Sequence, residues 1–362
     1  MKIAIVGAGI VGSTAAYYLS KEKDVEVTVF DHGLGQATKA AAGIISPWFS
    51  KRRNKAWYRM ARLGADFYQD LVSDLENDGY DTSFYDQSGV ALLKKDDSKL
   101  DGLYQHAETR LEESPIIGEL SIKNAADLPE FTGFDRYLYA SGGARVEGAE
   151  LTSTLIEASG FEKVEGLVTL SPLDNGTYEI NGQTFDKVIL SCGAWLGQTL
   201  EPLGFEVDVR PQKGQLRDYF FEGMDTGRLP VLMPEGELDV IPFAGGKISV
   251  GASHENDQGF DLTVDETVLA SLEEEAKTYF PDLSTAKSFS ERVGTRAYTS
   301  DFSPFFGEVP ELEGVFVASG LGSSGLTTGP LIGKNLVELA MNRPGSLDSS
   351  DYPVSQYVKK KD

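Results

Sequence analysis

Hydrophobic and polar positions follow the clearest pattern in the first thirty residues of the chain. Residues 2–6 (KIAIV) form a short apolar run, which is typical of a strand buried on both faces. Residues 10–20 carry apolar side chains at helical spacing. Residues 25–30 (VEVTVF) alternate in polarity and end at Asp31. This succession predicts one βαβ unit.

The rest of the chain has helical patterns near both ends and short strand patterns in the middle. An Asn181–Gly182 pair between two of the strand patterns predicts a tight hairpin turn. The expected helices are residues 53–75, 99–112, 149–158, 265–280 and 331–341, and the segment GLGSSGLTTGP before the last of them is expected to be a loop. The expected strands are residues 89–93, 163–170, 177–180, 184–190, 215–221, 239–242, 247–251 and 315–318.

These elements predict an α/β fold with an α+β insert. We expect a Rossmann-like nucleotide-binding domain assembled from separated segments, and a mainly antiparallel β-sheet domain with flanking helices. The first domain is expected to use residues 1–80, 141–205 and 314–345, and the second residues 81–140 and 206–313. The polar tail from Asn342, including residues 346–362, is expected to fray.

Composition narrows the possible partners. The chain has 33 basic and 56 acidic residues and a formal net charge of −23, which disfavours a nucleic-acid partner. One cysteine and three histidines cannot form an internal disulfide or a Cys/His zinc site within one chain, so no metal is expected. The apolar runs fall short of the roughly 20 residues of a membrane span. We expect a cytoplasmic protein without an integral membrane segment, which could form a homo-oligomer.

The glycine-rich turn after the first strand carries the first chemical signal. Residues 7–12 (GAGIVG) match G-x-G-x-x-G between a predicted strand and a predicted helix. Gly7 allows a tight turn, Gly9 lets the backbone approach a pyrophosphate, and Gly12 lets the helix pack closely on the strand. The N–H groups at the helix start favour a phosphate. The turn therefore predicts a dinucleotide site.

Asp31 lies nineteen residues after Gly12, at the end of the second strand. A carboxylate at this place can accept hydrogen bonds from a ribose diol, and its charge disfavours the 2′-phosphate of NADP. The motif by itself leaves FAD and NAD as alternatives.

The chain resembles the D-amino acid oxidase-like (DAO) flavoprotein family, in the branch of glycine oxidase, sarcosine oxidase and D-amino acid dehydrogenase. The resemblance runs nearly from end to end. Its motifs, in order, are GAGIVG (7–12), Asp31, ATKAAAGII (37–45), ILSCGAW (189–195), PQKGQL (211–216), VGASHENDQGFD (250–261), GTRAYTSDFSPFFG (294–307) and ASGLGSSGLTTGP (318–330).

The resemblance implies non-covalent FAD in an extended form, bound by small residues that let the backbone approach the ring. In relatives the 37–45 stretch runs beside the flavin, and the N-terminus of the last helix faces the flavin pyrimidine and stabilises its reduced anion. Cys192 is in the wrong segment for a covalent flavin link and is expected to be a small buried residue. The implied FAD contacts are Gly7, Ala8, Gly9, Ile10, Val11, Gly12, Phe30, Asp31, Thr38, Lys39, Ala41, Ala42, Gly43, Ile45, Val168, Cys192, Gly193, Ala194, Trp195, Gly320, Gly322, Ser323, Ser324, Gly325, Leu326 and Thr327.

The resemblance also implies the reaction, which is oxidation of the C–N bond of a small amino or imino acid. Hydride passes to flavin N5 and leaves an imine that water hydrolyses, and the electron acceptor is oxygen or a quinone-type acceptor. Arg296 in GTRAY matches the family arginine that binds the substrate carboxylate, and a guanidinium suits that role because it binds bidentately. Arg292, four residues earlier, is a weaker candidate for the same role or a salt-bridge partner, and His254 is expected to be structural or on the surface.

Two departures from the glycine oxidase pattern put glycine itself in doubt as the substrate. Asp239 and Ser323 stand approximately where such proteins carry a tyrosine and a second arginine. The aromatic and basic stretch 46–61 could line the site or be an exposed helix start. Two alternatives stay open, an NAD-dependent dehydrogenase and a flavin-binding redox-sensing or assembly protein without amine turnover.

Overall fold

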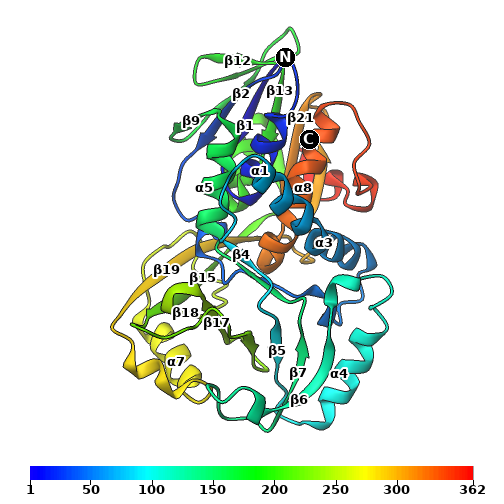
Figure 1. Ribbon diagram of the computed structural model, residues 1–362. Coiled ribbons are helices and arrows are strands. Elements are labelled where there is room, and N and C mark those ends of the chain that lie inside the picture. The colour runs from blue at the N-terminus through cyan, green and yellow to red at the C-terminus, as the bar shows by residue number, and fades with distance from the viewer. Residues whose placement is uncertain (362) are drawn as a thin grey trace.

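A computed structural model describes residues 1–361 and contains two large sheets, one in each lobe of the molecule (Figure 1). The upper sheet has six strands in the order β20-β21-β13-β1-β2-β9, and all neighbours are parallel except β20 and β21. Its strands are β1 (Lys2–Val6), β2 (Glu26–Asp31), β9 (Glu162–Glu165), β13 (Lys187–Leu190), β20 (Phe305–Glu308) and β21 (Val315–Ser319).

Both faces of the six-stranded sheet are covered, which explains the apolar runs of its strands. Ile3 and Ile5 of β1 pack in one buried cluster with α1 (Ile10–Leu19), α5 (Gly148–Ser159) and α8 (Gly325–Ala340). Ala4 and Val6 of the same strand pack in a second cluster on the opposite face. That face is covered by a small sheet and by α6 (Leu196–Leu200); the small sheet consists of β10 (Leu170–Pro172), β11 (Tyr178–Ile180) and β12 (Gln183–Phe185).

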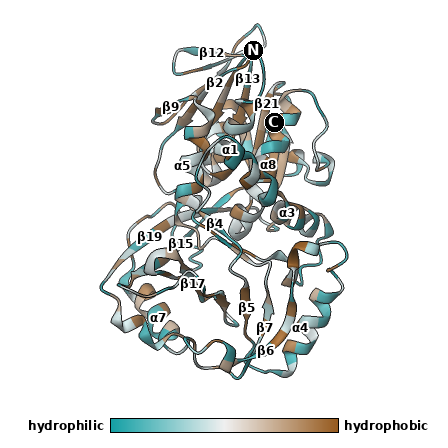
Figure 2. Ribbon diagram, in the orientation of Figure 1, coloured by the Kyte–Doolittle hydropathy of each residue, from teal (hydrophilic) through white to brown (hydrophobic). Residues whose placement is uncertain are grey.

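The lower sheet has eight strands in the order β19-β15-β18-β17-β16-β5-β7-β6. All neighbours are antiparallel except β16 and β5. Its apolar strand centres stand out in Figure 2, and helices α4 (Ser98–Glu108) and α7 (Glu266–Lys277) lie beside it. Its strands are β5 (Val90–Leu92), β6 (Leu120–Asn124), β7 (Arg136–Ala140), β15 (Arg210–Phe220), β16 (Val231–Met233), β17 (Asp239–Phe243), β18 (Lys247–Gly251) and β19 (Ser288–Tyr298).

Shorter elements join the two lobes. Helix α3 (Lys55–Asn77) is capped by the side chain of Asn54, which accepts a hydrogen bond from the Trp57 N–H at 3.0 Å, and it packs against α8. Helix α2 (Ala37–Ala40) packs against β19. A three-stranded sheet is formed by β3 (Ile44–Ile45), β8 (Ala144–Val146) and β4 (Tyr85–Asp86).

The structure confirms the α/β fold class and the βαβ unit, but two predicted strands are wrong in their extent. Residues 163–170 contain parts of β9 and β10, and residues 184–190 contain parts of β12 and β13; each pair belongs to two different sheets. Their apolar patterns run together because both strands of each pair are buried next to the same cluster. The hairpin turn is confirmed, since Asn181 and Gly182 have φ of 50° and 77°.

Helix α8 begins at Gly325 and not near Leu331, so half of the predicted loop is helical and Pro330 lies inside the helix. Proline lacks the N–H that would bond the carbonyl of Leu326 four residues earlier. The hydroxyl of buried Tyr68 donates to that carbonyl at 2.7 Å. A tertiary contact therefore replaces the missing helical hydrogen bond.

The expectation that the C-terminal tail frays is also wrong. β22 (Val358–Lys360) pairs with β14 (Phe205–Val207), and Tyr357 stacks on Phe305 with ring centroids 4.9 Å apart. The tail is mostly polar in composition, but a few of its apolar side chains are buried.

The range predicted for the second domain needs one correction. β20 lies in that range but pairs with β21 in the six-stranded sheet.

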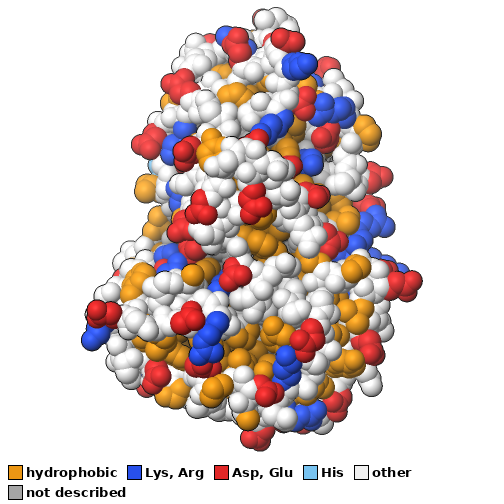
Figure 3. Space-filling view, in the orientation of Figure 1, with side chains coloured by type: hydrophobic (Ala, Val, Ile, Leu, Met, Phe, Trp, Pro, Cys, Tyr) orange, Lys and Arg blue, Asp and Glu red, His pale blue; other side chains and the backbone are white. Residues whose placement is uncertain are grey.

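Acidic and basic side chains are interspersed over the surface in Figure 3, while hydrophobic side chains gather over the lower sheet. Within residues 1–361, the helices are too short or too polar to cross a bilayer.

Candidate active site

Two adjoining cavities lie between the lobes, with volumes of about 370 and 420 Å³. We call them the nucleotide cavity and the substrate cavity. Ala37, Thr38, Gly322 and Gly325 line both, so the two form one elongated space. The nucleotide cavity lies beside the ends of β1, β2 and β13, and the substrate cavity lies over the eight-stranded sheet.

The glycine-rich turn forms the floor of the nucleotide cavity. Gly7 has φ of 102°, and a Cβ there would lie 2.4 Å from the Ser191 carbonyl oxygen; a Cβ on Gly12 would lie 1.8 Å from the Gly7 carbonyl oxygen. Both glycines are therefore required by the fold itself.

Gly9 differs from these two glycines. Its φ of −71° is accessible to any residue, and a Cβ there would meet only the Thr38 hydroxyl, at 3.4 Å. Within the chain, neither backbone conformation nor packing requires glycine at this position. The open space beside it belongs to the cavity, and the first turn of α1 directs free N–H groups there.

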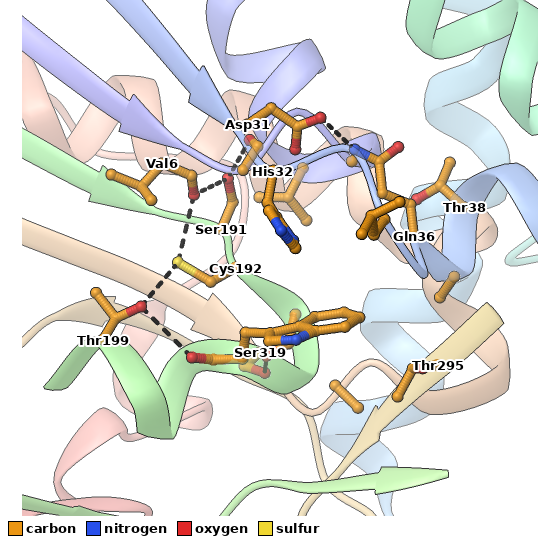
Figure 4. Close-up of a pocket in the computed structure, with 18 of the residues that line it drawn as sticks. Val6, Asp31, His32, Gln36, Thr38, Ser191, Cys192, Thr199, Thr295 and Ser319 are labelled. Carbon is orange, nitrogen blue, oxygen red and sulfur yellow. Dashed lines mark hydrogen bonds between the residues drawn. The ribbon is translucent and has the colours of Figure 1, made fainter. Parts of the chain in front are cut away.

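Asp31 is held at the rim of this cavity by two hydrogen bonds. Its Oδ1 accepts from the Ala8 N–H at 3.0 Å. Its Oδ2 accepts from Gln36 Nε2 at 2.6 Å, as Figure 4 shows. The side chain is buried, and a carboxylate fixed in this way can still accept hydrogen bonds from a ribose. Helix N–H groups and a carboxylate, one beside the other, are the donor and acceptor set that a dinucleotide needs.

Cys192 also lies in the nucleotide cavity, next to Thr199 and the Val6 carbonyl (Figure 4). Burial raises the pKa of its thiol to about 11, so the neutral form dominates near neutral pH. The side chain is half-buried and faces the cavity, so the expectation of a buried packing residue holds only in part.

Helix α8 points its N-terminus at the junction of the two cavities. Ser324 makes no side-chain cap there, and the first turn contains no acidic residue, so its N–H groups and the helix dipole face open space. A Cβ on Gly322 would lie 2.1 Å from the Tyr298 ring, and the Tyr298 hydroxyl accepts from the Ser323 N–H at 3.1 Å. The helix dipole at this end can stabilise negative charge on a group bound at the junction.

Strand β19 separates the cavities, because its successive side chains point to opposite faces. Thr295 and Ala297 line the nucleotide cavity, whereas Gly294 and Arg296 line the substrate cavity. A Cβ on Gly294 would lie 2.7 Å from the Cβ of Ala40, so glycine is needed for α2 to pack here.

Arg296 is the cation of the substrate cavity. Its Nη1 donates to the Ser253 carbonyl at 2.8 Å and to Gln212 Oε1 at 3.2 Å. Among residues 1–361 its Nη2 and Nε have no hydrogen-bond partner, so they can bind a carboxylate. The guanidinium lies over Gly214, where a Cβ would be 2.5 Å from Nη1.

Arg292, in contrast, forms an ion pair, which was the second of the two alternatives for it. Its Nη2 donates to Asp218 Oδ1 at 2.8 Å, and its Nη1 donates to the carbonyl of Ala41 at 3.1 Å. It thereby ties the eight-stranded sheet to the segment that follows α2.

The cavities gather most of the residues predicted from the family resemblance. The nucleotide cavity is lined by the predicted residues Gly7, Gly9, Ile10, Val11, Phe30, Asp31, Thr38, Val168, Cys192, Gly193, Trp195, Gly322 and Gly325. The substrate cavity is lined by the predicted residues Thr38, Ala41, Ala42, Gly43, Arg296, Gly322, Ser323, Ser324, Gly325, Leu326 and Thr327.

Six predicted residues line neither cavity and instead support the walls. Gly12 packs on Gly7, the Ala8 N–H binds Asp31, and the Lys39 carbonyl lies 3.4 Å from Arg292 Nη1. Ile45 and Ala194 are buried, and a Cβ on Gly320 would lie 2.9 Å from the Ser303 carbonyl oxygen.

The structure adds lining residues that sequence reasoning missed. His254 is exposed, in line with its expectation, and it also lines the substrate cavity. Parts of the 46–61 stretch line the same cavity, while residues 51–55, up to the start of α3, are exposed, so both alternatives for that stretch hold in part. The alternation along GTRA could have indicated that Thr295 faces away from Arg296. The added residues include His32, Leu34, Gln36, Ser191, Thr199 and Thr295 in the nucleotide cavity, and Ser46, Trp57, Gly214, Met233, Glu237, Asp239 and Ala252 in the substrate cavity.

Comparison with known proteins identifies the family. Residues 2–339 match the family described as DAO, FAD dependent oxidoreductase. The chain therefore belongs to the DAO family of FAD-dependent oxidoreductases, and FAD is its cofactor. When bound, FAD supplies the hydride-accepting ring, and the residues that line the two cavities are the candidates to bind and orient it.

Relatives match the chain over nearly its whole length. It is 38% identical to "Uncharacterized oxidoreductase YurR" of Bacillus subtilis, over 96% of this chain and 97% of that protein. It is 29% identical to glycine oxidase of Pseudomonas aeruginosa, over 97% and 98%. The crystal structure of iminodiacetate oxidase (IdaA) from Chelativorans sp. BNC1 superposes with a TM-score of 0.91 at 30% identity, covering 97% of this chain and 98% of that one.

Proposed function

We propose that this protein oxidises the C–N bond of a small amino or imino acid whose carboxylate binds Arg296. Hydride leaves the α-carbon for the flavin, and the resulting imine is hydrolysed by water. The main observation in support is that Nη2 of Arg296 is free to bind a ligand in the substrate cavity. The N-terminus of α8 lines the same cavity. Amine oxidation is also the activity named for the glycine oxidase and iminodiacetate oxidase relatives.

The position of Arg296 relative to Gly214 and the start of α8 supports this substrate class. A carboxylate on Arg296 fixes one end of a small substrate over Gly214, which leaves its α-carbon free to lie between the sheet and the residues at the start of α8. The proposal keeps oxygen or a quinone-type acceptor as the oxidant and the cytoplasm as the place of action.

The test is the visible spectrum of the purified holoenzyme under anaerobic conditions. Glycine, sarcosine, proline, iminodiacetate and D-amino acids are added in turn, and bleaching of the oxidised flavin band identifies the substrate class. A flavin that dithionite reduces but that none of these compounds bleaches would contradict the proposed activity.

A variant then tests the position of the site. Arg296→Gln is expected to retain FAD and to lower kcat/KM for the bleaching substrate by about 10²-fold or more, since a charge-assisted bidentate contact is lost. Arg59→Gln removes an exposed arginine that pairs with Asp351 and serves as the control. Equal kinetics of the two variants would show that the carboxylate binds elsewhere.

A further inference from the structure

The substrate cavity contains a carboxyl group that the proposed function does not yet use. Asp239 begins β17 and lines the cavity, yet among residues 1–361 its side chain makes no hydrogen bond and no ion pair.

Strand register places Asp239 and Arg296 on the same face of the eight-stranded sheet. Directly paired residues of antiparallel strands share a face, and so do residues two apart on one strand. Arg296 pairs with Gln212 on β15, and Leu216 of the same strand pairs with Gly251 on β18. Gly251 in turn pairs with Asp239. All of these positions therefore face the cavity side.

The Arg296 guanidinium also reaches toward Asp239 along that face. It extends over Gly214 and donates to the carbonyl of Ser253, two residues after the Gly251 that pairs with Asp239. Both groups line the same cavity from one face of the sheet. The carboxylate and the amino group of one small amino acid can therefore meet them with a hydrogen bond at each end.

The groups around Asp239 leave it without a counter-charge of its own. β16 contributes Met233, the β16–β17 loop contributes Glu237, and the chain after β18 contributes His254. His254 Nδ1 lies 3.7 Å from Glu237 Oε1, and burial together with Arg296 lowers the His254 pKa. The opposite wall offers serine hydroxyls, Trp57 and backbone amides. Arg296 is the only permanent cation among the described residues that line this cavity.

A cavity wall with a guanidinium at one point and an unpaired carboxyl at another is complementary to a zwitterion. We propose that Asp239 binds the amino group of the substrate and accepts the proton that its ammonium form must lose. This inference rests on the proposed function and deepens it, because it assigns the second anchor of the amino acid and the base of the reaction.

The proton step balances between the substrate, this one side chain and the solvent. Asp239 is neutral near pH 7 in the free protein, so binding of the ammonium group first releases the Asp239 proton to the solvent. The N–H bond of the ammonium then breaks, an O–H bond forms on the resulting Asp239 carboxylate, and the nitrogen lone pair becomes available to stabilise the developing imine. The pKa of Asp239 is raised by burial to about 8, which matches a group that exchanges a proton near neutral pH.

The test measures binding to the holoenzyme without turnover. 2-Aminoisobutyrate has a carboxylate and an ammonium group but no α-hydrogen, and isobutyrate lacks the amino group. At pH 7 the wild type is expected to bind 2-aminoisobutyrate about tenfold or more tightly than isobutyrate, because a charge-assisted hydrogen bond is added. Calorimetry in two buffers of different ionisation enthalpy should show about one proton released with 2-aminoisobutyrate and none with isobutyrate.

Variants attribute both signals to one residue. Asp239→Asn is expected to abolish the preference and the proton release, while Asp239→Glu, which keeps an acceptor, retains the proton release. Glu235→Gln removes a negative charge from the same loop but outside this cavity, and it should behave as the wild type. Flavin content and circular dichroism establish that each variant is folded.

The outcomes separate the two proposals. If Asp239→Asn keeps the preference and the proton release of the wild type, the role of Asp239 is overturned while the Arg296 site stands. If isobutyrate fails to bind the wild type, the carboxylate site of the proposed function is wrong, and the inference fails with it.

Discussion

The nucleotide cavity and the substrate cavity differ in the source of their polar groups, although the single strand β19 separates them. In the nucleotide cavity the groups suited to phosphate and ribose are helix N–H groups beside glycines and one carboxylate, which accepts hydrogen bonds from Ala8 and Gln36. In the substrate cavity the ionisable groups Arg296, Asp239 and His254 are side chains supplied by different strands and loops of the eight-stranded sheet. Binding groups from the backbone can be supplied by one contiguous sequence motif. Binding groups from side chains of several strands come together only when those strands pair in the right register.

The largest effect, loss of the cofactor, is expected where a charged side chain is added to the nucleotide cavity. Gly9→Glu should fold but lose FAD, because the chain itself tolerates a Cβ at Gly9 while a carboxylate there occupies and repels the pyrophosphate. The measurement is the flavin-to-protein absorbance ratio, with circular dichroism as the folding check. Gly102→Glu, at a helix position where a Cβ meets nothing within 4 Å, is the matched control. A yellow Gly9→Glu protein at full stoichiometry would refute the assignment of this cavity.

The next largest effect is expected from a substitution in the substrate cavity that leaves its charged residues in place. Gly214→Ala should raise KM for a carboxylate substrate by about tenfold or more, because its Cβ would lie 2.5 Å from Arg296 Nη1 and must displace the guanidinium. FAD should stay bound. Steady-state kinetics beside Gly102→Ala provide the comparison, and an unchanged KM would show that the position of Arg296 over Gly214 is unimportant.

A pH effect on stability distinguishes Asp239 from a solvated carboxylate. In the unfolded chain its carboxyl ionises with the ordinary pKa of 3.8, whereas in the folded protein it stays neutral up to about pH 8. Rising pH therefore disfavours the folded wild type over this window, and Asn is neutral throughout. The Tm advantage of Asp239→Asn should be near zero below pH 4, grow with pH and level off above pH 8. A constant Tm difference from pH 4 to pH 9 would indicate a solvated side chain.

The smallest effect concerns the helix that serves both cavities. Tyr68→Phe should lower the free energy of unfolding by about 1–2 kcal/mol, because the Leu326 carbonyl loses its donor. In a Pro330→Ala background the helix N–H is restored, so the same substitution should have less effect. Urea denaturation of the four proteins gives this double-mutant cycle. Equal losses in both backgrounds would mean that the hydroxyl does not substitute for the missing helical bond.

Much of the nucleotide-binding lobe was predictable because its signals are local. The glycine spacing, the β1–α1–β2 unit and Asp31 at the end of β2 are consecutive in the chain, and the structure has them as expected. The tail was mispredicted for the opposite reason, since β22 pairs with β14, which lies about 150 residues earlier in the chain, and its apolar side chains pack in a cluster formed by distant strands.

For the substrate cavity, the sequence by itself determined Arg296 through a family motif, and it marked Asp239 only as a departure. Tertiary structure decided the rest. The register of β15, β18 and β17 places Asp239 and Arg296 on one face, and the burial of Asp239 without a cation changes its ionisation. Composition and spacing report which side chains a chain carries, but a cavity depends on which distant strands pair and how each is shifted, because a shift of one residue turns every side chain to the other face.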